Sequence, residues 1–440
     1  MTHRLERNGV AAEYPVPYYI GSGHVGRSYL ITLGGRLFQS PLSYYSHQKR
    51  WDMSPGYERE LAPDFDRPVG ADCLFCHGGS VRAEPPLSAQ RITCQRCHGD
   101  ASRHLGAPSR SNIVNPVRLE PARRDSVCEQ CHLSGEIRIL HPGKAWDDFK
   151  PGMLTEEVFS TFVRAEAAGA GPVKVVSHVE QMHESKCFRR SAGRMWCGTC
   201  HDPHGASEDP RVAYRSACLG CHSDSTLVRH GAPKDDCIGC HMPKRAAMDV
   251  PHTAFTNHRI PRTREAPEKA AGTEALRPWR EVADAFAQRG VGLAYIGLGD
   301  RDASVDLLQQ GFRILTAVEA RFADDPDVLS AIGLVLLRKQ VPEQAFARFS
   351  RVVALRPSDA SAWLNQGIAL YQTRKVPAAI NSLEKSISLD PSPAGPYRLL
   401  AEIHRTSGNH ALAQRTIERY MSFMPQHLDL RHSRRRTHIP

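Results

Sequence analysis

The sequence predicts a mainly α-helical chain with two unlike parts, a loop-rich segment followed by an α-solenoid. The first part contains six Cys-x-x-Cys-His motifs between residues 73 and 241, in a stretch rich in His, Arg, Asp, Gly and Pro and short of apolar side chains. In the second part, small and large apolar residues recur every 34 positions after residue 280, which is the period of a helix-pair repeat. A chain of 440 residues has room for two or three domains.

The order of segments along the chain follows from these patterns. Before the motifs, residues 28–33 and 36–40 predict two strands joined by a tight turn at Gly34 and Gly35. Between the third and fourth motifs, residues 156–168 predict an amphipathic helix. We expect an N-terminal segment with the β-hairpin (1–72), a six-motif domain (73–260), a polar linker (261–279), a repeat domain (280–425) and a basic tail (426–440).

The spacing within each motif points to one cofactor. Two thiols three positions apart, with a histidine directly after the second, are the attachment signature of c-type haem. The thiols form thioethers with the porphyrin vinyl groups, and the histidine ligates the iron. The sequence therefore predicts six covalently attached haems c, which supply much of the core of this domain. The cysteines are Cys73, Cys76, Cys94, Cys97, Cys128, Cys131, Cys197, Cys200, Cys218, Cys221, Cys237 and Cys240, and the proximal histidines are His77, His98, His132, His201, His222 and His241.

Two other uses of paired cysteines fit the motifs less well. Zinc ribbons are built from Cys-x-x-Cys units but need no histidine directly after the second cysteine, and all six motifs have one. Cysteines this close make poor structural disulfides, and a chain this long needs no such staples. Cys187, the thirteenth cysteine, belongs to no motif. We expect a free or partly buried structural thiol there, with an iron ligand or a redox-reactive thiol as the alternative.

The composition excludes some partners and locations. The formal charge is +10, but the propionates of six ferric haems bring it down by about 6, so nucleic-acid binding is not expected. The arginine-rich end is a solvated tail in this interpretation. No apolar run approaches the ~20 residues of a membrane helix, and no signal-peptide pattern opens the chain. Because haem attachment takes place outside the cytoplasmic membrane, we expect a periplasmic or extracellular protein whose gene product begins before residue 1.

The C-terminal third carries the tetratricopeptide pattern. Small residues mark the helix crossings, large ones fill the space between helices, and a proline ends each second helix. A stretch at about 280–325 predicts a degenerate unit with a longer second helix. Such units stack as a right-handed solenoid. The recurring positions are Pro357, Pro391 and Pro425; Gly333, Gly367 and Ala401; Ala345, Ala379 and Ala413; Phe349, Leu383 and Ile417; and Leu329, Trp363 and Tyr397.

The chain resembles the multihaem cytochromes c that carry C-terminal tetratricopeptide repeats, a family related to the tetrahaem cytochrome of ammonia oxidisers and to the multihaem oxidoreductases. The resemblance covers nearly the whole chain. It implies bis-His haems in close packed pairs, and one or two further motifs upstream in many members. The matching segments are Gly21-Ser-Gly with Arg27-Ser-Tyr-Leu30, Trp51-Asp-Met-Ser-Pro-Gly56, Cys94-Gln-Arg-Cys-His-Gly99, Ile113-Val-Asn-Pro116, Cys197-Gly-Thr-Cys-His-Asp-Pro-His204 and Cys237-Ile-Gly-Cys-His-Met-Pro-Lys-Arg245, with Asp249-Val-Pro-His252 and His258 behind it.

Six irons with one histidine each leave six positions for a second axial ligand, and the first 260 residues hold eleven further histidines. His204 lies three residues after His201, cannot turn back to the same iron, and should ligate a neighbouring one. The same reasoning applies to His104 after His98. The predicted distal ligands are His24, His104, His178, His204, His252 and His258, with His183 and His230 in reserve.

Three functions are compatible with these predictions. Electron transfer is favoured, because irons with two histidines bind no substrate, and the concave repeats would then dock redox partner proteins. The alternative is a multihaem oxidoreductase that acts on a small nitrogen or sulfur compound at one open-sided haem. The third is a structural subunit of a respiratory assembly. The sequence singles out no catalytic residue and leaves open whether the protein is an enzyme and which oligomer it forms.

Overall fold

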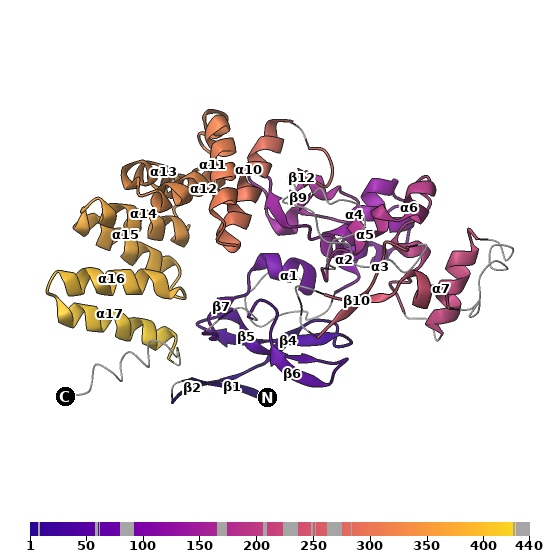
Figure 1. The fold of residues 1–440 in the computed structure, drawn as a ribbon, viewed down its shortest axis with the longest axis horizontal. Coiled ribbons are helices and arrows are strands. Elements are labelled where there is room, and N and C mark those ends of the chain that lie inside the picture. Colours follow the sequence, from indigo (N-terminus) through magenta and orange to yellow (C-terminus); the bar gives the residue numbers. More distant parts are fainter. Residues whose placement is uncertain are drawn as a thin grey trace.

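The fold is seen in a computed structural model (Figure 1), which describes residues 1–7, 9–57, 60, 62–79, 92–164, 174–205, 209–222, 236–247, 250, 252–261, 275–282, 284–425 and 427. His230, most of the expected linker and nearly all of the basic tail lie outside these residues. None of the helices in these ranges is both long enough and apolar enough to cross a membrane.

The N-terminal segment is a β structure. β1 (Thr2–Arg7) and β2 (Val10–Pro15) form a two-stranded ribbon. β4 and β5 pair antiparallel across the turn at Gly34 and Gly35, where the sequence predicts it. The strands extend further than the predicted hairpin and belong to a larger sheet. Its members are β3 (Tyr18–Ile20), β4 (Gly26–Leu33), β5 (Arg36–Tyr45), β6 (Arg50–Met53) and β7 (Arg67–Pro68).

The two faces of this sheet pack against different partners. Phe38 and Tyr29 lie in one apolar cluster with the β1–β2 ribbon. On the opposite face, Leu30 and Leu37 pack with Leu74 and the Cys73 side chain of the first motif. Side chains alternate along a strand, so each strand supplies both clusters. The sheet therefore lies directly against the first motif.

The motif segment consists of short helices joined by loops, in the centre and right of Figure 1. It also holds several 3₁₀ turns and one β-hairpin, β10 (Lys244–Ala246) with β11 (Ala254–Thr256). The helices are α1 (Ala71–His77), α2 (Gln95–His98), α3 (Ser102–Gly106), α4 (Pro121–His132), α5 (His178–Glu184), α6 (Lys186–Arg190), α7 (Pro210–Leu219) and α9 (Cys237–His241).

A three-stranded sheet joins the motif segment to the repeats. It consists of β8 (Ile137–Leu140), β9 (Phe159–Arg164) and β12 (Leu276–Pro278), in the order β12-β9-β8. The helix predicted over residues 156–168 is therefore wrong. Phe159 packs with Phe75 in one cluster, and Phe162 packs with Leu298 in another. Residues 159–163 are all buried, so the strand lacks the alternation of apolar and polar residues that marks a half-buried strand. The end of the expected linker is also a strand, since β12 pairs with β9.

The repeats begin at regular intervals. The first helices of three pairs start at Pro326, Ala360 and Ala394, 34 residues apart. An additional pair precedes them, and here its first helix is the longer one, contrary to the expected longer second helix. The helices are α10 (Asp284–Arg301), α11 (Val305–Val318), α12 (Pro326–Arg338), α13 (Pro342–Leu355), α14 (Ala360–Gln372), α15 (Val376–Leu389), α16 (Ala394–Thr406) and α17 (His410–Phe423).

The small residues of the repeat lie where helices cross. A Cβ on Gly333 would come within 2.8 Å of the Phe349 ring, and a Cβ on Gly367 within 2.9 Å of Leu383. Phe349 and Leu383 are fully buried, and Ala345 and Ala379 show no exposure. A larger residue at the glycine positions would push the paired helices apart.

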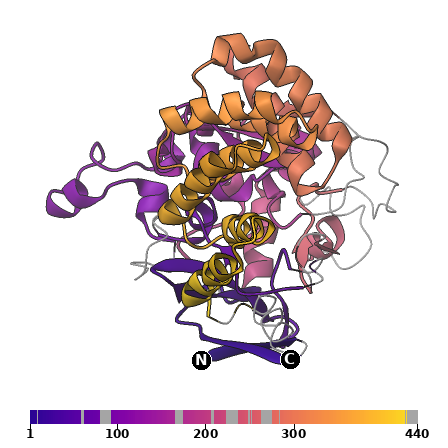
Figure 2. The same ribbon diagram turned by 90° about the vertical axis from the view of Figure 1, so that its left-hand side faces the viewer.

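The solenoid contacts the rest of the chain at both ends. At its start, α10 packs on β8, β9 and β12. At its end, the side chain of Phe423 lies against Gly34 at the tip of the N-terminal hairpin, and Arg36 forms a 2.9 Å ion pair with Asp390. Figure 1 shows the repeats curving from the top of the molecule down to β5 and β7, and Figure 2 shows the same arc from its outer side. The repeat domain is thus anchored at both ends.

Candidate haem-binding site

Each motif, numbered 1 to 6 in chain order, contains a turn of helix. In motif 2 the His98 amide donates to the Cys94 carbonyl at 2.9 Å, and in motif 4 the His201 amide donates to Cys197 at 3.0 Å. Positions i, i+3 and i+4 of a helix lie on one face. The two thiols and the imidazole of a motif therefore project to the same side, as attachment to a single porphyrin requires.

Three motif histidines face a second histidine, and each partner is a predicted distal ligand. The ring centroids of His98 and His204 are 5.8 Å apart, with 19° between the ring planes. His132 and His178 are 5.7 Å apart at 85°. The third pair, His201 and His258, is 6.1 Å apart at 29°. With metal–nitrogen bonds of about 2 Å and ring centres about 1 Å further, two axial imidazoles have centroids about 6 Å apart.

Hydrogen bonds at Nδ1 leave Nε2 available on two of these imidazoles, His98 and His258. Nδ1 of His98 donates to the Val114 carbonyl at 2.7 Å. Nδ1 of His258 donates to the Thr256 carbonyl at 2.8 Å. A proton on Nδ1 places the lone pair on Nε2, and this arrangement is usual for metal-bound histidine. The residues present fit a bis-His iron, and the iron ligation itself stays a prediction.

Two of the pairs adjoin each other in a buried cluster. His178 lies 4.8 Å from His258, centroid to centroid, and thereby links the pair around motif 3 to the pair around motif 4. Burial, with His258, His132 and His201 nearby, lowers the pKa of His178 to about 3. Its Nδ1 is buried and has no hydrogen-bond partner. Neutral imidazoles with free lone pairs are the form that binds metal.

All thirteen cysteines lie among the described residues, and each is a free thiol there. The hydrogen bond with the Cys131 thiol, assisted by Arg138 and His77, lowers the pKa of the Cys76 thiol to about 6 against the effect of burial. Cys128 contacts Cys197 in the same way, and Cys218 contacts Cys237. These contacts bring motif 1 to motif 3, motif 3 to motif 4, and motif 5 to motif 6.

Among the described residues, no three His, Cys, Asp or Glu side chains converge on one point. A zinc ribbon needs four ligands in a tetrahedron, whereas a haem iron needs two axial ligands from the protein.

Cys187, the cysteine outside the motifs, is half-buried, and burial raises the pKa of its thiol.

Three predicted distal ligands have other surroundings. His24 is exposed in its glycine-rich turn. His104 lies on α3, with its Nδ1 3.0 Å from Asn112 Oδ1. His252 has a left-handed backbone, with φ of 56°, and its Nε2 lies 2.6 Å from Asp52 Oδ2. This contact joins two of the segments on which the family resemblance is based, Trp51–Gly56 and Asp249–His252. None of these three histidines has a ring contact with a motif histidine in the part of the chain that the structure describes.

Other residues contact the site although the sequence analysis did not identify them as site residues. Glu129, between the cysteines of motif 3, is 1% exposed. It accepts from Arg280 Nη2 at 2.7 Å and from Trp279 Nε1 at 3.3 Å. Burial raises its pKa to about 7, although Arg280 opposes the shift. The carbonyl of Val114, which holds His98, lies in the segment Ile113–Pro116, and the family resemblance was the only sequence signal for it.

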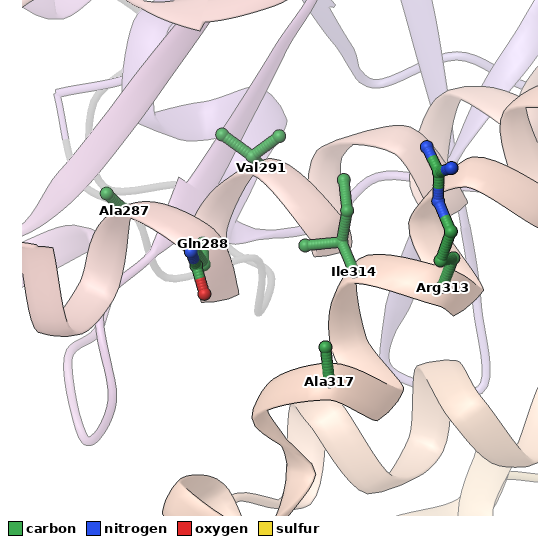
Figure 3. Close-up of a pocket in the computed structure, with 6 residues that line it drawn as sticks. All are labelled: Ala287, Gln288, Val291, Arg313, Ile314 and Ala317. Carbon is green, nitrogen blue, oxygen red and sulfur yellow. The ribbon is translucent and has the colours of Figure 1, made fainter.

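A separate cavity lies on the repeat domain. Figure 3 shows this pocket of about 450 Å³ between α10 and α11, with apolar side chains and one guanidinium around it. No motif residue contributes to it. The lining residues are Ala287, Gln288, Val291, Arg313, Ile314 and Ala317.

Comparison with known proteins gives partial matches. No protein-family model matches the chain. Dissimilatory sulfite reductase MccA of Wolinella succinogenes is 22% identical over 230 residues, which cover 45% of this chain and 29% of that protein. The chloroplastic tetratricopeptide repeat domain-containing protein PYG7 of Arabidopsis thaliana is 30% identical over 79 residues, 17% of this chain and 26% of that protein. The chain thus aligns with less than a third of the length of either relative. The PYG7 match agrees with the repeats of α12 to α17.

Solved structures match over about a third of this chain. MamA from Desulfovibrio magneticus RS-1 has a TM-score of 0.30 and 21% identity, over 33% of this chain and 78% of that chain. The Cut9–Hcn1 tetramer of the APC/C has a TM-score of 0.29 and 20% identity, over 33% of this chain and 31% of that chain.

Proposed function

We propose that this protein is a multihaem c-type cytochrome that transfers electrons through six covalently attached haems. The observation that carries the proposal is the approach of His204, His178 and His258 to the histidines of motifs 2, 3 and 4, at 5.7 to 6.1 Å. Each of the three partners is a histidine that the sequence predicts as a distal ligand, and each lies at about the separation of two axial imidazoles. Bound haem would supply a one-electron carrier at each motif, and at motifs 2, 3 and 4 two imidazoles would hold its iron saturated.

The contacts between motifs support transfer along a chain. Cys76 and Cys131 connect motifs 1 and 3, and Cys128 and Cys197 connect motifs 3 and 4. Gln130, inside motif 3, donates to the Arg96 carbonyl inside motif 2 at 2.8 Å. Motif 3 therefore contacts three other motifs, and we expect it to be the branch point of the electron path.

The remaining parts of the proposal concern partners and location. The repeat domain offers a surface for a redox partner protein, since stacked helix pairs form extended binding faces. Covalent haem attachment requires a periplasmic or extracellular site of maturation. Nucleic acid plays no part in this function.

The haem count is tested on the holoprotein matured in a periplasm with haem-attachment machinery. Intact mass should show six haem additions, and the ferric protein should have low-spin spectra at the three paired motifs. Bound zinc without haem would contradict the proposal. A mass with fewer additions would show how many motifs stay empty.

A second function is catalysis at one open-sided haem, and the match to a dissimilatory sulfite reductase favours it. His77 and His222 have no ring partner among the described residues, so motifs 1 and 5 are the candidate sites. Sulfite added to protein reduced with titanium(III) citrate should then re-oxidise it, and carbon monoxide should block the reaction. Protein that sulfite leaves reduced would support electron transfer alone.

A further inference from the structure

A projecting arm follows motif 2. It consists of α3 and the loop that returns to Asn112, and Figure 2 shows it as a short helix and loop, in the purple of residues just after 100, standing out from the body on the left. Three contacts brace it internally. Asn112 Nδ2 donates to the Ala107 carbonyl at 2.8 Å, the Ser109 and Ser111 hydroxyls lie 2.8 Å apart, and His104 bridges the two sides. The arm is thus a braced structure.

The bracing sets the tautomer of His104. Its Nδ1 lies 3.0 Å from Asn112 Oδ1 and 3.1 Å from the Ser109 carbonyl, both of which are acceptors. The donation from Asn112 Nδ2 to Ala107 orients the amide, so the oxygen is the atom that faces the imidazole. The Ser109 amide approaches the same nitrogen only at 3.4 Å. Nδ1 therefore carries the proton, and Nε2 carries a lone pair that bonds nothing in the described structure. This is the state of a metal-binding imidazole.

The arm presents what a haem edge would contact. Next to His104, Leu105 is 80% exposed, the highest fraction among the large apolar side chains of the described residues. Arg103 and Arg110 are exposed on the same arm, and no acidic residue lies between Ser102 and Leu119. A haem combines an iron, an apolar macrocycle and two anionic propionates. Imidazole, leucine and guanidinium groups match these three parts in turn.

The same chain has a motif that needs such a ligand. His77 is exposed and has no ring partner among the described residues, although all six motif histidines are described. His104 faces none of these six. Each copy therefore offers the His104 imidazole without an iron, and its motif 1, like motif 5, has a histidine that lacks a ring partner among the described residues. Two copies satisfy each other if the arm of one reaches motif 1 of the other, which is a closed and symmetric arrangement.

We propose, on the basis of the haem assignment above, that the protein forms a dimer in which His104 of each copy is the distal ligand of the motif 1 haem in the other. Electrons can then cross between copies next to motif 2. The iron–imidazole bond forms and breaks with dimerisation, without redox change. Dilution should convert one centre per chain from low to high spin as the dimer dissociates.

The test measures mass and spin state together on the holoprotein over a dilution series. The wild type should pass from dimer to monomer, by mass photometry, as high-spin absorbance appears. In His104→Ala the dimer dissociation constant should rise at least about tenfold, and one centre should be high spin at every concentration. His47→Ala, at an exposed histidine outside the arm, is the matched control and should behave as wild type.

Two further results decide the proposal. Microperoxidase, a haem peptide with one axial histidine, should become low spin on mixing with dilute wild type, and about tenfold more weakly with His104→Ala. A wild type that stays monomeric at all concentrations would overturn the exchange between copies, even if microperoxidase binds. A dimer in which His104→Ala changes no spin state would overturn the ligand assignment. Six haems by mass in either case would leave the proposed function intact.

Discussion

Arg289 and Asp325 form a buried two-point ion pair at the junction of the two domains. Nε of Arg289 donates to Asp325 Oδ2 at 2.6 Å, and Nη2 donates to Oδ1 at 3.2 Å. Arg289 is 1% exposed. Its Nη1 donates to the Leu140 carbonyl of β8, and its Nη2 also reaches Asp327 at 2.9 Å. One side chain of α10 thus joins the start of α12 to the sheet beside the motif segment.

Replacement of Arg289 should be strongly destabilising. Arg289→Met leaves Asp325 buried without its cation, and such a loss costs about 3–5 kcal/mol. The measurement is unfolding of the holoprotein by guanidinium chloride, followed by circular dichroism. Arg351→Met is the control, because its ion pair with Asp324 has side chains 50% and 67% exposed. Exposed pairs of this kind contribute roughly 0–1 kcal/mol. Equal losses in both variants would show that burial does not set the strength of the Arg289 pair.

The contact between the first hairpin and the last helix can be isolated with two neighbouring glycines. Both have left-handed backbones, with φ of 53° at Gly34 and 76° at Gly35. A Cβ on Gly34 would overlap the ring of Phe423, whereas a Cβ on Gly35 meets nothing within 4 Å. Gly35→Ala should cost only the backbone strain, about 1–2 kcal/mol. Gly34→Ala should add about 1–3 kcal/mol of overpacking.

Removal of the Phe423 ring tests whether the extra cost of Gly34→Ala comes from this contact. In a Phe423→Ala background, the extra cost of Gly34→Ala over Gly35→Ala should disappear, because the clash has no second partner. The wild type, Gly34→Ala, Phe423→Ala and the double variant form a double-mutant cycle, in which the free energies of unfolding are compared. A difference that persists without Phe423 would place the strain within the hairpin.

His204 should act on motif 2 and not on its own motif. His204→Ala should convert one low-spin centre to high spin and raise its reduction potential by about 100 mV, within the ~0.8 V that axial ligands span. Optical potentiometry of the holoprotein measures the shift, with His47→Ala as the control. The structural reason is that the ring centroids of His204 and His98 lie 5.8 Å apart. Six unchanged potentials would make His204 a surface residue, paired only with Asp202 at 3.2 Å.

The repeats could be predicted from the sequence because their signal is local. The positions of Gly333 and Phe349 recur with the helices, and their contact lies within one helix pair. The strand β9 could not be predicted in this way. Phe159 and Phe162 each bury in a different cluster, and both clusters include residues far along the chain. Tertiary packing, not periodicity, decides that segment.

In the candidate site, too, the sequence predicted the local features but not the contacts between distant segments. The residue types and spacing marked His204, His178 and His258 as ligand candidates, but not the motif that each would face. The pairing of His98 with His204 depends on how distant segments fold together. His104 and His252 were both predicted as distal ligands, yet one contacts Asn112 and the other contacts Asp52. Histidine density predicts the chemistry, and only the fold assigns the partners.

The two domains should differ in their need for cofactor. In the repeat domain, Phe349 is buried in one apolar cluster, and Leu383 and Tyr397 in another, so the core is made of side chains. In the motif segment the buried apolar residues form small clusters, and several pack on the N-terminal sheet or on α10. Residues 280–425, expressed alone in a cytoplasm without haem attachment, should melt cooperatively as helices. Residues 1–260 under the same conditions should show no cooperative transition of the motif segment, because cofactor binding supplies its folding free energy. Circular dichroism melts of the two fragments measure this. A cooperative melt of the haem-free motif fragment would mean that side chains alone specify its fold.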